Sequence, residues 1–342
     1  MARPPLDDYL VHLRGLPFVK SVATGRRRAD GGLALSLATS TGKARLEAIE
    51  ATGPLSYAVA EHLAQRVRAF EVPSILLLPE VSRDMAAFLR ERGVLFVDLQ
   101  GNCHVALGDA YVASVEGRRV EQRTPRGQTA MRAAGYRVLF ALLAERALVG
   151  QPLRSIAERA GASRQAASDA LARLVAAGVL DRQGGTHRWV PHRQQMALEQ
   201  WLGGYESILR PSLLLGSFRT PDTDPVALER RITDSLKERT TYRWGGCAAG
   251  HRLTGHFRGE RTVLHVEELT AALRRALAAV PDPRGSLVLL RVPGPAALAG
   301  GTPDTVHPLL VYAEMLAAHD DRAREAAAEV AERFLSPAEH AS

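Results

Sequence analysis

Residues 151–191 carry the clearest local signals of structure in this chain and read QPLRSIAERAGASRQAASDALARLVAAGVLDRQGGTHRWVP. Pro152 suits the first position of a helix, because its missing N–H would have no partner there in any case. Apolar residues then recur at helical spacing until Gly161 interrupts them. Ser163 suits the N-cap of a second helix, since its hydroxyl can accept a backbone N–H. Gly178 suits the left-handed position that ends such a helix.

Two glycines, Gly184 and Gly185, separate two short extended runs and predict a tight β-hairpin. Helix, turn, helix and hairpin, in this order, predict a winged helix-turn-helix. In that arrangement the second helix enters the DNA major groove, and its first residues meet base edges. The alternative is a structural helical hairpin whose charged face contacts only solvent.

The outward side chains of this segment have the chemistry of DNA contacts. Arg bonds guanine, Gln bonds adenine and Ser bonds either, so we expect Arg164, Gln165 and Ser168 to read bases. Basic residues on the first helix, the end of the second and the hairpin are expected to contact phosphates. The complete predicted DNA-binding set is Arg154, Ser163, Arg164, Gln165, Ser168, Arg173, Arg182, His187 and Arg188.

The distribution of charge agrees with this prediction. The chain has 342 residues, 46% of them hydrophobic, and a formal net charge of +7. Residues 126–200 hold 11 basic and 5 acidic residues, or +6, against +2 for residues 1–125 and −1 for residues 201–342. A local basic excess is typical of a surface that binds a polyanion.

The cysteines, the lack of long apolar runs and the lack of nucleotide-binding motifs exclude several classes of protein. Cys103 and Cys247 are the only cysteines, which favours reduced thiols and excludes a zinc site built from cysteine alone. The polar start of the sequence and the absence of a long apolar run predict a cytoplasmic, nucleoid-associated protein with no membrane contact. With no Gly-x-Gly-x-x-Gly or P-loop motif, we expect no nucleotide or other cofactor.

We expect an α/β multidomain protein with three parts. Residues 1–125 form a mixed α/β domain, with helices at 6–13, 57–70 and 85–92 and strands at 33–38, 73–79, 94–98, 103–107 and 111–115. An Arg-rich linker at 117–130 leads into a winged helix-turn-helix domain at 126–193, whose first helix spans 130–148. Residues 194–342 form a C-terminal α/β domain with helices at 196–209, 226–238, 269–280, 309–316 and 321–335 and strands at 213–218, 262–266 and 286–292.

Several stretches of this sequence resemble antitoxins of the AbiEi type. The run LPEVSRDMAAFLRERGVLFVDLQGN at 78–102 is similar to the region that precedes the winged helix in that family. The segments Trp244-Gly-Gly, Ala248-Ala, Leu253-Thr-Gly and His307-Pro-Leu-Leu-Val-Tyr-Ala are similar to its C-terminal region, so that the resemblance covers most of residues 70–335. The chain departs from the short members in having about 125 residues before the winged helix.

The resemblance implies a regulator that represses its own operon through the winged helix. It also implies an indirect link to a nucleotidyltransferase-like toxin, which such antitoxins counteract without a tight complex. From the residues alone we expect a homodimer, because paired half-sites multiply the affinity of a small DNA-reading domain.

The N-terminal part also resembles a restriction-endonuclease-like core, in which Asp98, Gln100 and Asn102 would occupy the metal-binding strand. Gln in place of an acid and Asn in place of Lys leave little charge for Mg²⁺. We therefore favour a turn shaped by Asp98 and Asn102, and predict no catalytic residues.

Two further patterns were compared with a nucleotidyltransferase site and with a zinc site. Gly216-Ser217 followed by Asp222 and Asp224 resembles a nucleotidyltransferase signature, but the spacing is short and flanking prolines favour a loop. His251, His256 and His265 have spacings that fit no known zinc pattern, so we predict no metal site.

The leading hypothesis is a sequence-specific double-stranded DNA-binding transcriptional regulator that is not an enzyme. Two alternatives stay open at this stage. One is a metal-dependent nuclease or nucleotidyltransferase that uses the winged helix for targeting. The other is a non-catalytic adaptor whose winged helix binds another protein.

Overall fold

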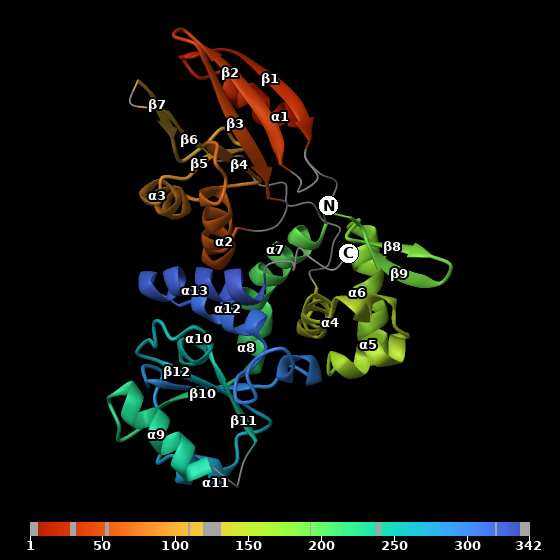
Figure 1. The fold of residues 1–342 in the computed structure, drawn as a ribbon, viewed down its shortest axis with the longest axis vertical. Coiled ribbons are helices and arrows are strands. Elements are labelled where there is room, and N and C mark those ends of the chain that lie inside the picture. Colours follow the sequence, from red (N-terminus) through yellow and green to blue (C-terminus); the bar gives the residue numbers. More distant parts are fainter. Residues whose placement is uncertain are drawn as a thin grey trace. The chain divides into compact units, whose positions relative to one another are not determined.

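The computed structural model of the chain describes residues 6–27, 32–51, 55–108, 110–118, 131–191, 193–236, 241–318 and 320–335. Its architecture is mixed α/β (Figure 1). One compact unit comprises Met1–Ala130, Ala176–Leu180 and Trp189–Gly203, and the other Met131–Val175, Asp181–Arg188 and Gly204–Ser342. The three domain boundaries expected from the sequence stay a prediction, and most of the expected linker, residues 119–130, lies outside the described residues.

The N-terminal part of the chain is built on one sheet. Its helices are α1 (Leu6–Arg14), α2 (Tyr57–Arg68) and α3 (Arg83–Glu91). Its strands are β1 (Val19–Arg27), β2 (Leu33–Thr39), β3 (Lys43–Glu50), β4 (Ser74–Leu78), β5 (Leu95–Asp98), β6 (Cys103–Leu107) and β7 (Tyr111–Val115), which pair in chain order (Figure 1). The pairs β3–β4 and β4–β5 are parallel and the other neighbours are antiparallel.

This sheet buries both faces at its centre. Every residue of β4 is buried, since its alternate residues Ile75 and Leu77 pack in one core cluster with α1 while the crossover helices α2 and α3 contact β4 and β5. Tyr9, Leu10 and Leu13 of α1 join one core cluster with alternate residues of the sheet, among them Leu35 and Leu37. Helices α2 and α3, which connect the parallel strands, contact β4 and β5. The restriction-endonuclease likeness of this part stays a prediction.

Residues 133–191 form short helices and a hairpin. The elements are α4 (Ala133–Ala144), a 3-10 turn η1 (Arg146–Gly150), α5 (Leu153–Arg159), α6 (Arg164–Ala176), β8 (Leu180–Gln183) and β9 (Thr186–Trp189). The single helix expected over 130–148 is shorter, because Glu145 leaves the helical region with φ −126° and ψ 82°. Pro152 is the N-cap of α5 and not its first helical residue.

The C-terminal part contains a second sheet. Its helices are α7 (Gln194–Gly204), the π-helical turn η2 (Tyr205–Leu209), α8 (Arg210–Leu213), α9 (Pro225–Leu236), α10 (Gly246–Thr254), α11 (Ala271–Ala276), the 3-10 turn η3 (Pro295–Leu298), α12 (Pro308–Leu316) and α13 (Asp321–Phe334). Its strands are β10 (Leu214–Arg219), β11 (Tyr242–Gly245), β12 (Thr262–Val266), β13 (Val280–Pro281) and β14 (Leu287–Arg291), in the order β11-β12-β14-β10-β13.

Helices cover this second sheet and build its core. Every residue of α12 is buried, and α12 packs against α10 and α13 (Figure 1). The helix expected over 269–280 ends at Ala276, since Ala278 has a positive φ of 47° and Val280-Pro281 pair with β10. Residues 237–238 of another expected helix lie outside the described residues. Among the helices described, none combines the length and the apolar character that a membrane crossing requires.

Candidate nucleic-acid interface

Helix α6 begins where the sequence predicts. Gly161 has a φ of 59°, a conformation that glycine adopts without steric cost. The hydroxyl of Ser163 accepts the backbone N–H of Ala166 at 3.1 Å, so it caps the helix that starts at Arg164. Gly178, with φ 67°, follows the other end of the helix. These local features fix the direction in which α6 leaves the turn.

The two faces of α6 differ sharply in chemistry. The buried residues are Ala167, Ala170, Leu171 and Leu174. The exposed residues are Arg164, Gln165, Ser168, Asp169, Ala172, Arg173 and Ala176. Four polar side chains, Arg164, Gln165, Ser168 and Asp169, therefore stand on the outer face of the first two turns of α6, where a groove-reading helix contacts bases.

The hairpin after α6 closes through a tight turn. Gly184 and Gly185 have φ values of 57° and 85°, the combination that a type I′ turn requires. The hydroxyl of Thr186 donates to the carbonyl of Gln183 at 2.9 Å across this turn. The hairpin predicted from the glycine pair is therefore present in the structure.

Basic side chains of the hairpin face outward. Arg182 and Arg188 are exposed, and His187 is half-buried. Partial burial, and then the positive charge of Arg182, lowers the pKa of His187. At neutral pH the hairpin therefore offers two guanidinium groups and a neutral imidazole.

Arg154 is exposed on α5. Nearby Arg159, in contrast, is paired with Glu145 through both carboxylate oxygens. The guanidinium of Arg137 donates to the carbonyl of Gly161 at 2.9 Å and so supports the turn before α6. Arg154 thus belongs to the outer surface, whereas Arg159 and Arg137 hold the helices in place.

Sequence reasoning missed one acidic residue on the outer face of α6. The amide nitrogen of Gln165 donates to Oδ1 of Asp169 at 2.8 Å. The spacing i,i+4 was the available signal, because residues four apart on a helix are neighbours. An acidic group therefore lies within the set of predicted base readers.

Asp98 and Asn102 form a structural turn, as the sequence analysis favoured. Asp98 is fully buried, and its carboxylate accepts the backbone N–H groups of Val81, Gln100 and Asn102 at 2.8 to 3.0 Å. The side-chain amide of Asn102 donates to Asp98 and to the carbonyl of Arg118. The carboxylate oxygens of Asp98 are thus engaged in holding the loop.

Asp222 and Asp224 lie in a loop, also as expected. Asp222 pairs with Arg231 of α9. Asp224 accepts the N–H of Ala227 at 2.8 Å and caps the start of α9. The two carboxylates are engaged by α9, in structural roles.

His251, His256 and His265 do not come together in one site. The ring of His251 contacts the carbonyl of His256, whose Nε2 lies 2.8 Å from Glu329. His265 is buried, and its Nε2 lies 2.7 Å from Oε1 of Glu314. Within the described residues, no group of three or more His, Cys, Asp or Glu side chains can hold a metal ion.

Glu314 lies at the centre of a buried polar cluster that the sequence did not reveal. The hydroxyl of Tyr205 donates to its Oε1 at 2.8 Å, and His265 contacts the same oxygen. Burial opposes the charge of Glu314, but His265, Tyr205 and Arg210 outweigh it and lower the pKa of this carboxyl. A Cβ on Gly245 would lie 2.7 Å from Oε2 of Glu314, so glycine is required beside the cluster.

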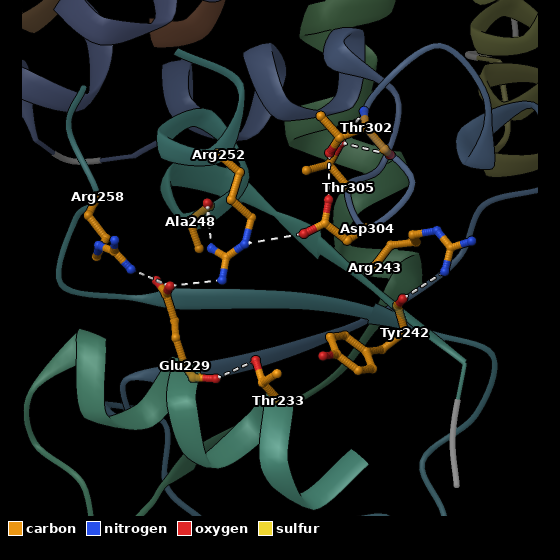
Figure 2. Close-up of polar contacts among 10 residues, drawn as sticks. All are labelled: Glu229, Thr233, Tyr242, Arg243, Ala248, Arg252, Arg258, Thr302, Asp304 and Thr305. Carbon is orange, nitrogen blue, oxygen red and sulfur yellow. Dashed lines mark hydrogen bonds and ion pairs between the residues drawn. The ribbon is translucent and has the colours of Figure 1, made fainter. Parts of the chain in front are cut away.

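A second polar network holds β11 and α10 to their neighbours. The guanidinium of Arg252 lies 2.9 Å from Glu229 and 3.6 Å from Asp304, between the two carboxylates (Figure 2). Its guanidinium carbon lies 3.7 Å above the ring of Trp244, and Arg258 shares the carboxylate of Glu229. Acidic partners therefore balance the charges of Arg252 and Arg258. For Arg154 and Arg182, in contrast, no ion pair is found among the described residues.

Comparison with known families gives one match. Residues 191–336 match a family model described as "Transcriptional regulator, AbiEi antitoxin, Type IV TA system". The resemblance to AbiEi-type antitoxins is thus confirmed for this part of the chain. No curated protein and no solved structure matches the chain. The likeness noted for residues 70–190 lies outside the matched region and stays a prediction.

The matched region, residues 191–336, contains both the buried cluster around Glu314 and the network around Arg252. The residues that carried the resemblance occupy structural positions in it, with Trp244 beneath Arg252 and Gly245 beside Glu314. His307 caps α12 by accepting the N–H of Leu309 at 3.0 Å. These structural residues therefore lie within the matched region, whereas the outward residues of α6 and of the hairpin lie before residue 191.

Proposed function

We propose that the chain is a sequence-specific double-stranded DNA-binding transcriptional regulator, an AbiEi-like antitoxin that represses its own operon. Its DNA-reading part is a winged helix-turn-helix made of α4, α5, α6 and the β8–β9 hairpin. The observation that carries this proposal is the outer face of α6, which is polar at its capped start and lies in the most basic part of the chain. The family match over residues 191–336 supports the regulatory role.

The mechanism follows from the placement of charge. Helix α6 enters the major groove with Ser163 and Arg164 first, and Arg164 bonds the O6 and N7 acceptors of a guanine. Gln165 and Ser168 meet the next bases on the same face. Arg154, Arg173, Arg182, His187 and Arg188 contact phosphates on either side, which fixes the register of the helix.

Two copies bind together in this proposal, because one such helix reads only a few base pairs. A two-fold symmetric pair places two α6 helices about one helical turn of DNA apart. The cognate toxin is nucleotidyltransferase-like and is counteracted indirectly, as the family resemblance implies. The N-terminal and C-terminal α/β parts provide the contacts between copies.

The decisive experiment measures binding of the full-length protein to labelled DNA from upstream of its own gene. Arg164→Ala should weaken specific binding by about ten-fold or more, since a bidentate guanine contact contributes roughly 1–3 kcal/mol. Arg275→Ala, which removes an exposed arginine on α11, is the matched control and should bind like the unaltered protein. Equal loss in both variants would reject the assigned interface.

The same preparation separates the alternatives. DNA binding by charge neutralisation must weaken steeply as salt is raised, because counterions are released from the duplex. An adaptor would bind no DNA even at low salt. A nuclease or nucleotidyltransferase would change plasmid DNA or tRNA in the presence of Mg²⁺ and nucleotide, and Asp222→Ala would abolish that activity.

A further inference from the structure

We propose that Asp169 determines DNA specificity by presenting, together with Gln165, hydrogen-bond acceptors that select the amino group of cytosine in the major groove. This inference rests on the proposed DNA-binding function and adds a residue to the predicted readers. It also assigns the class of base that the second turn of α6 recognises.

The geometry of the pair comes first. Gln165 and Asp169 are both exposed and lie one turn apart on the outer face of α6. Nε2 of Gln165 lies 2.8 Å from Oδ1 of Asp169. An ionised carboxylate only accepts hydrogen bonds, so the amide must turn its nitrogen toward Asp169 and its oxygen away. Asp169 therefore fixes the orientation of the Gln165 amide before any DNA arrives.

The outward atoms of the pair are then mostly acceptors. Oε1 of Gln165 and Oδ2 of Asp169 have no hydrogen-bond partner among the described residues. In the major groove, cytosine N4 and adenine N6 are the donors, and Asp accepts characteristically from cytosine N4. Guanine O6 and thymine O4 are acceptors, which a carboxylate repels. The pair thus favours cytosine, which presents only a donor, over adenine, whose N6 donor lies beside the N7 acceptor, and it disfavours guanine and thymine by repulsion.

The charge of Asp169 also distinguishes specificity from general affinity. A carboxylate close to DNA phosphates weakens binding to every sequence, because it opposes the attraction of the surrounding arginines. A carboxylate kept only for helix stability would contribute a few tenths of a kcal/mol through its contact with Gln165. The two roles give different results when the base beneath Asp169 is varied.

The test is selection of binding sites from randomised duplex DNA, followed by affinity measurements on single-base variants of the selected site. It uses the full-length protein, Asp169→Asn, Asp169→Ala and Glu325→Gln. The last replaces an exposed acid on α13 and serves as the charge-matched control. Thermal unfolding of each variant checks that α6 stays folded.

The unaltered protein and Glu325→Gln should select a cytosine at one position of each half-site and disfavour guanine or thymine there by about ten-fold. Asp169→Asn should accept guanine or thymine at that position, because an amide can also donate. Asp169→Ala should bind all four bases there with similar affinity. Base preferences at the positions read by Arg164 should stay unchanged in both variants.

Two results would overturn the proposal in distinguishable ways. If the Asp169 variants bind every sequence more tightly by one common factor and keep the same selected site, Asp169 acts only through its charge and the inference fails while the DNA-binding function stands. If the unaltered protein selects no sequence at all, the proposed function itself fails, and the inference with it.

Discussion

The backbone of Gly161 lies directly against that of Gly294. A Cβ placed on Gly294 would lie 2.6 Å from the carbonyl carbon of Ala160, and one placed on Gly161 would lie 3.0 Å from Cα of Gly294. The turn that precedes α6 is therefore fitted against the loop between β14 and η3 with no room for a side chain. Tyr136 makes a comparable contact with Gly204, where a Cβ would meet its ring.

The first prediction concerns this glycine contact. Gly294→Ala should destabilise the protein by about 1–3 kcal/mol, because the added methyl group meets backbone atoms that cannot rotate away. The loss should appear as a lower midpoint in thermal or urea unfolding. It should also weaken the proposed DNA binding, since the turn before α6 must shift to relieve the clash.

Gly150→Ala provides the control for this substitution. No atom lies within 4 Å of a Cβ on Gly150, which also has an ordinary negative φ. Its unfolding midpoint should match that of the unaltered protein or rise slightly. Equal midpoints for Gly294→Ala and Gly150→Ala would contradict the close contact.

The second prediction concerns the buried cluster of Tyr205, His265 and Glu314. The folded protein holds the pKa of Glu314 below its ordinary value of 4.5, so the native state stays ionised where the unfolded chain takes up a proton. The stability from this group is complete above pH 4.5 and is lost as the pH falls through the folded pKa. Urea midpoints measured against pH should show this acid loss, and Glu314→Gln should remove that component.

Glu314→Gln should also lower stability at neutral pH by about 3–5 kcal/mol, the cost typical of breaking a buried pair. Tyr205→Phe should cost about 1–3 kcal/mol, because it removes one donor from a buried carboxylate. An unchanged acid profile in Glu314→Gln would show that other carboxyls cause the loss.

Local signals in the sequence predicted much of the candidate interface. Ser163 and the pair Gly184-Gly185 specify their own backbone geometry, so a cap and a hairpin follow from residues a few positions apart. The apolar run of β4 likewise needs no distant information to indicate a buried strand. The i,i+4 spacing of Gln165 and Asp169 was also a local signal, but the orientation of the Gln165 amide depends on a side-chain contact that only the structure shows.

Elements that depend on distant partners were not predicted. Strand β1 is exposed along most of its length and lacks the alternation of apolar residues that indicates a half-buried strand. Strand β11 was not predicted, because it is defined by its pairing with β12, in which Trp244 lies opposite Leu264. The cluster around Glu314 joins residues up to 109 positions apart, a relation that no local pattern carries.

The third prediction concerns His62 and Glu199, which belong to one buried network in α2 and α7. Nε2 of His62 contacts the amide of Gln195, and Glu199 pairs with Arg66 at 2.6 Å. Burial, and then the charge of Arg66, lowers the pKa of His62 to about 3. Burial raises the pKa of Glu199 to about 7, although Arg66 acts in the opposite direction.

These two groups have opposite effects on stability. Between about pH 3 and 6.5 the unfolded chain protonates His62 and the native state does not, so stability falls as the pH is lowered. Between pH 4.5 and about 7 the native state keeps a proton on Glu199 that the unfolded chain loses, so stability rises as the pH is lowered. Between pH 4.5 and 6.5, where both groups act, the two changes of stability with pH should largely cancel.

Single substitutions separate the effects of His62 and Glu199 on the pH dependence of stability. Glu199→Gln should lose stability more steeply than the unaltered protein as the pH falls from about 6.5 to 4.5, and His62→Gln should lose it less steeply. The measurement is the urea midpoint of each variant minus that of the unaltered protein at each pH. Differences that do not vary with pH would show that neither group changes protonation in this window.

The fourth prediction concerns His187 of the hairpin and the pH dependence of DNA binding. In the free protein, partial burial and the charge of Arg182 lower the pKa of His187, so the ring is neutral at pH 7. A phosphate beside the ring favours its charged form, so binding takes up a proton and affinity should rise as the pH is lowered from about 8 to 5.5, by at most ten-fold per pH unit. His187→Gln should show a flatter pH profile, whereas Arg188→Ala should weaken binding at every pH and keep the slope. Parallel profiles for His187→Gln and the unaltered protein would place the phosphate away from this histidine and would require a different orientation of the hairpin on DNA.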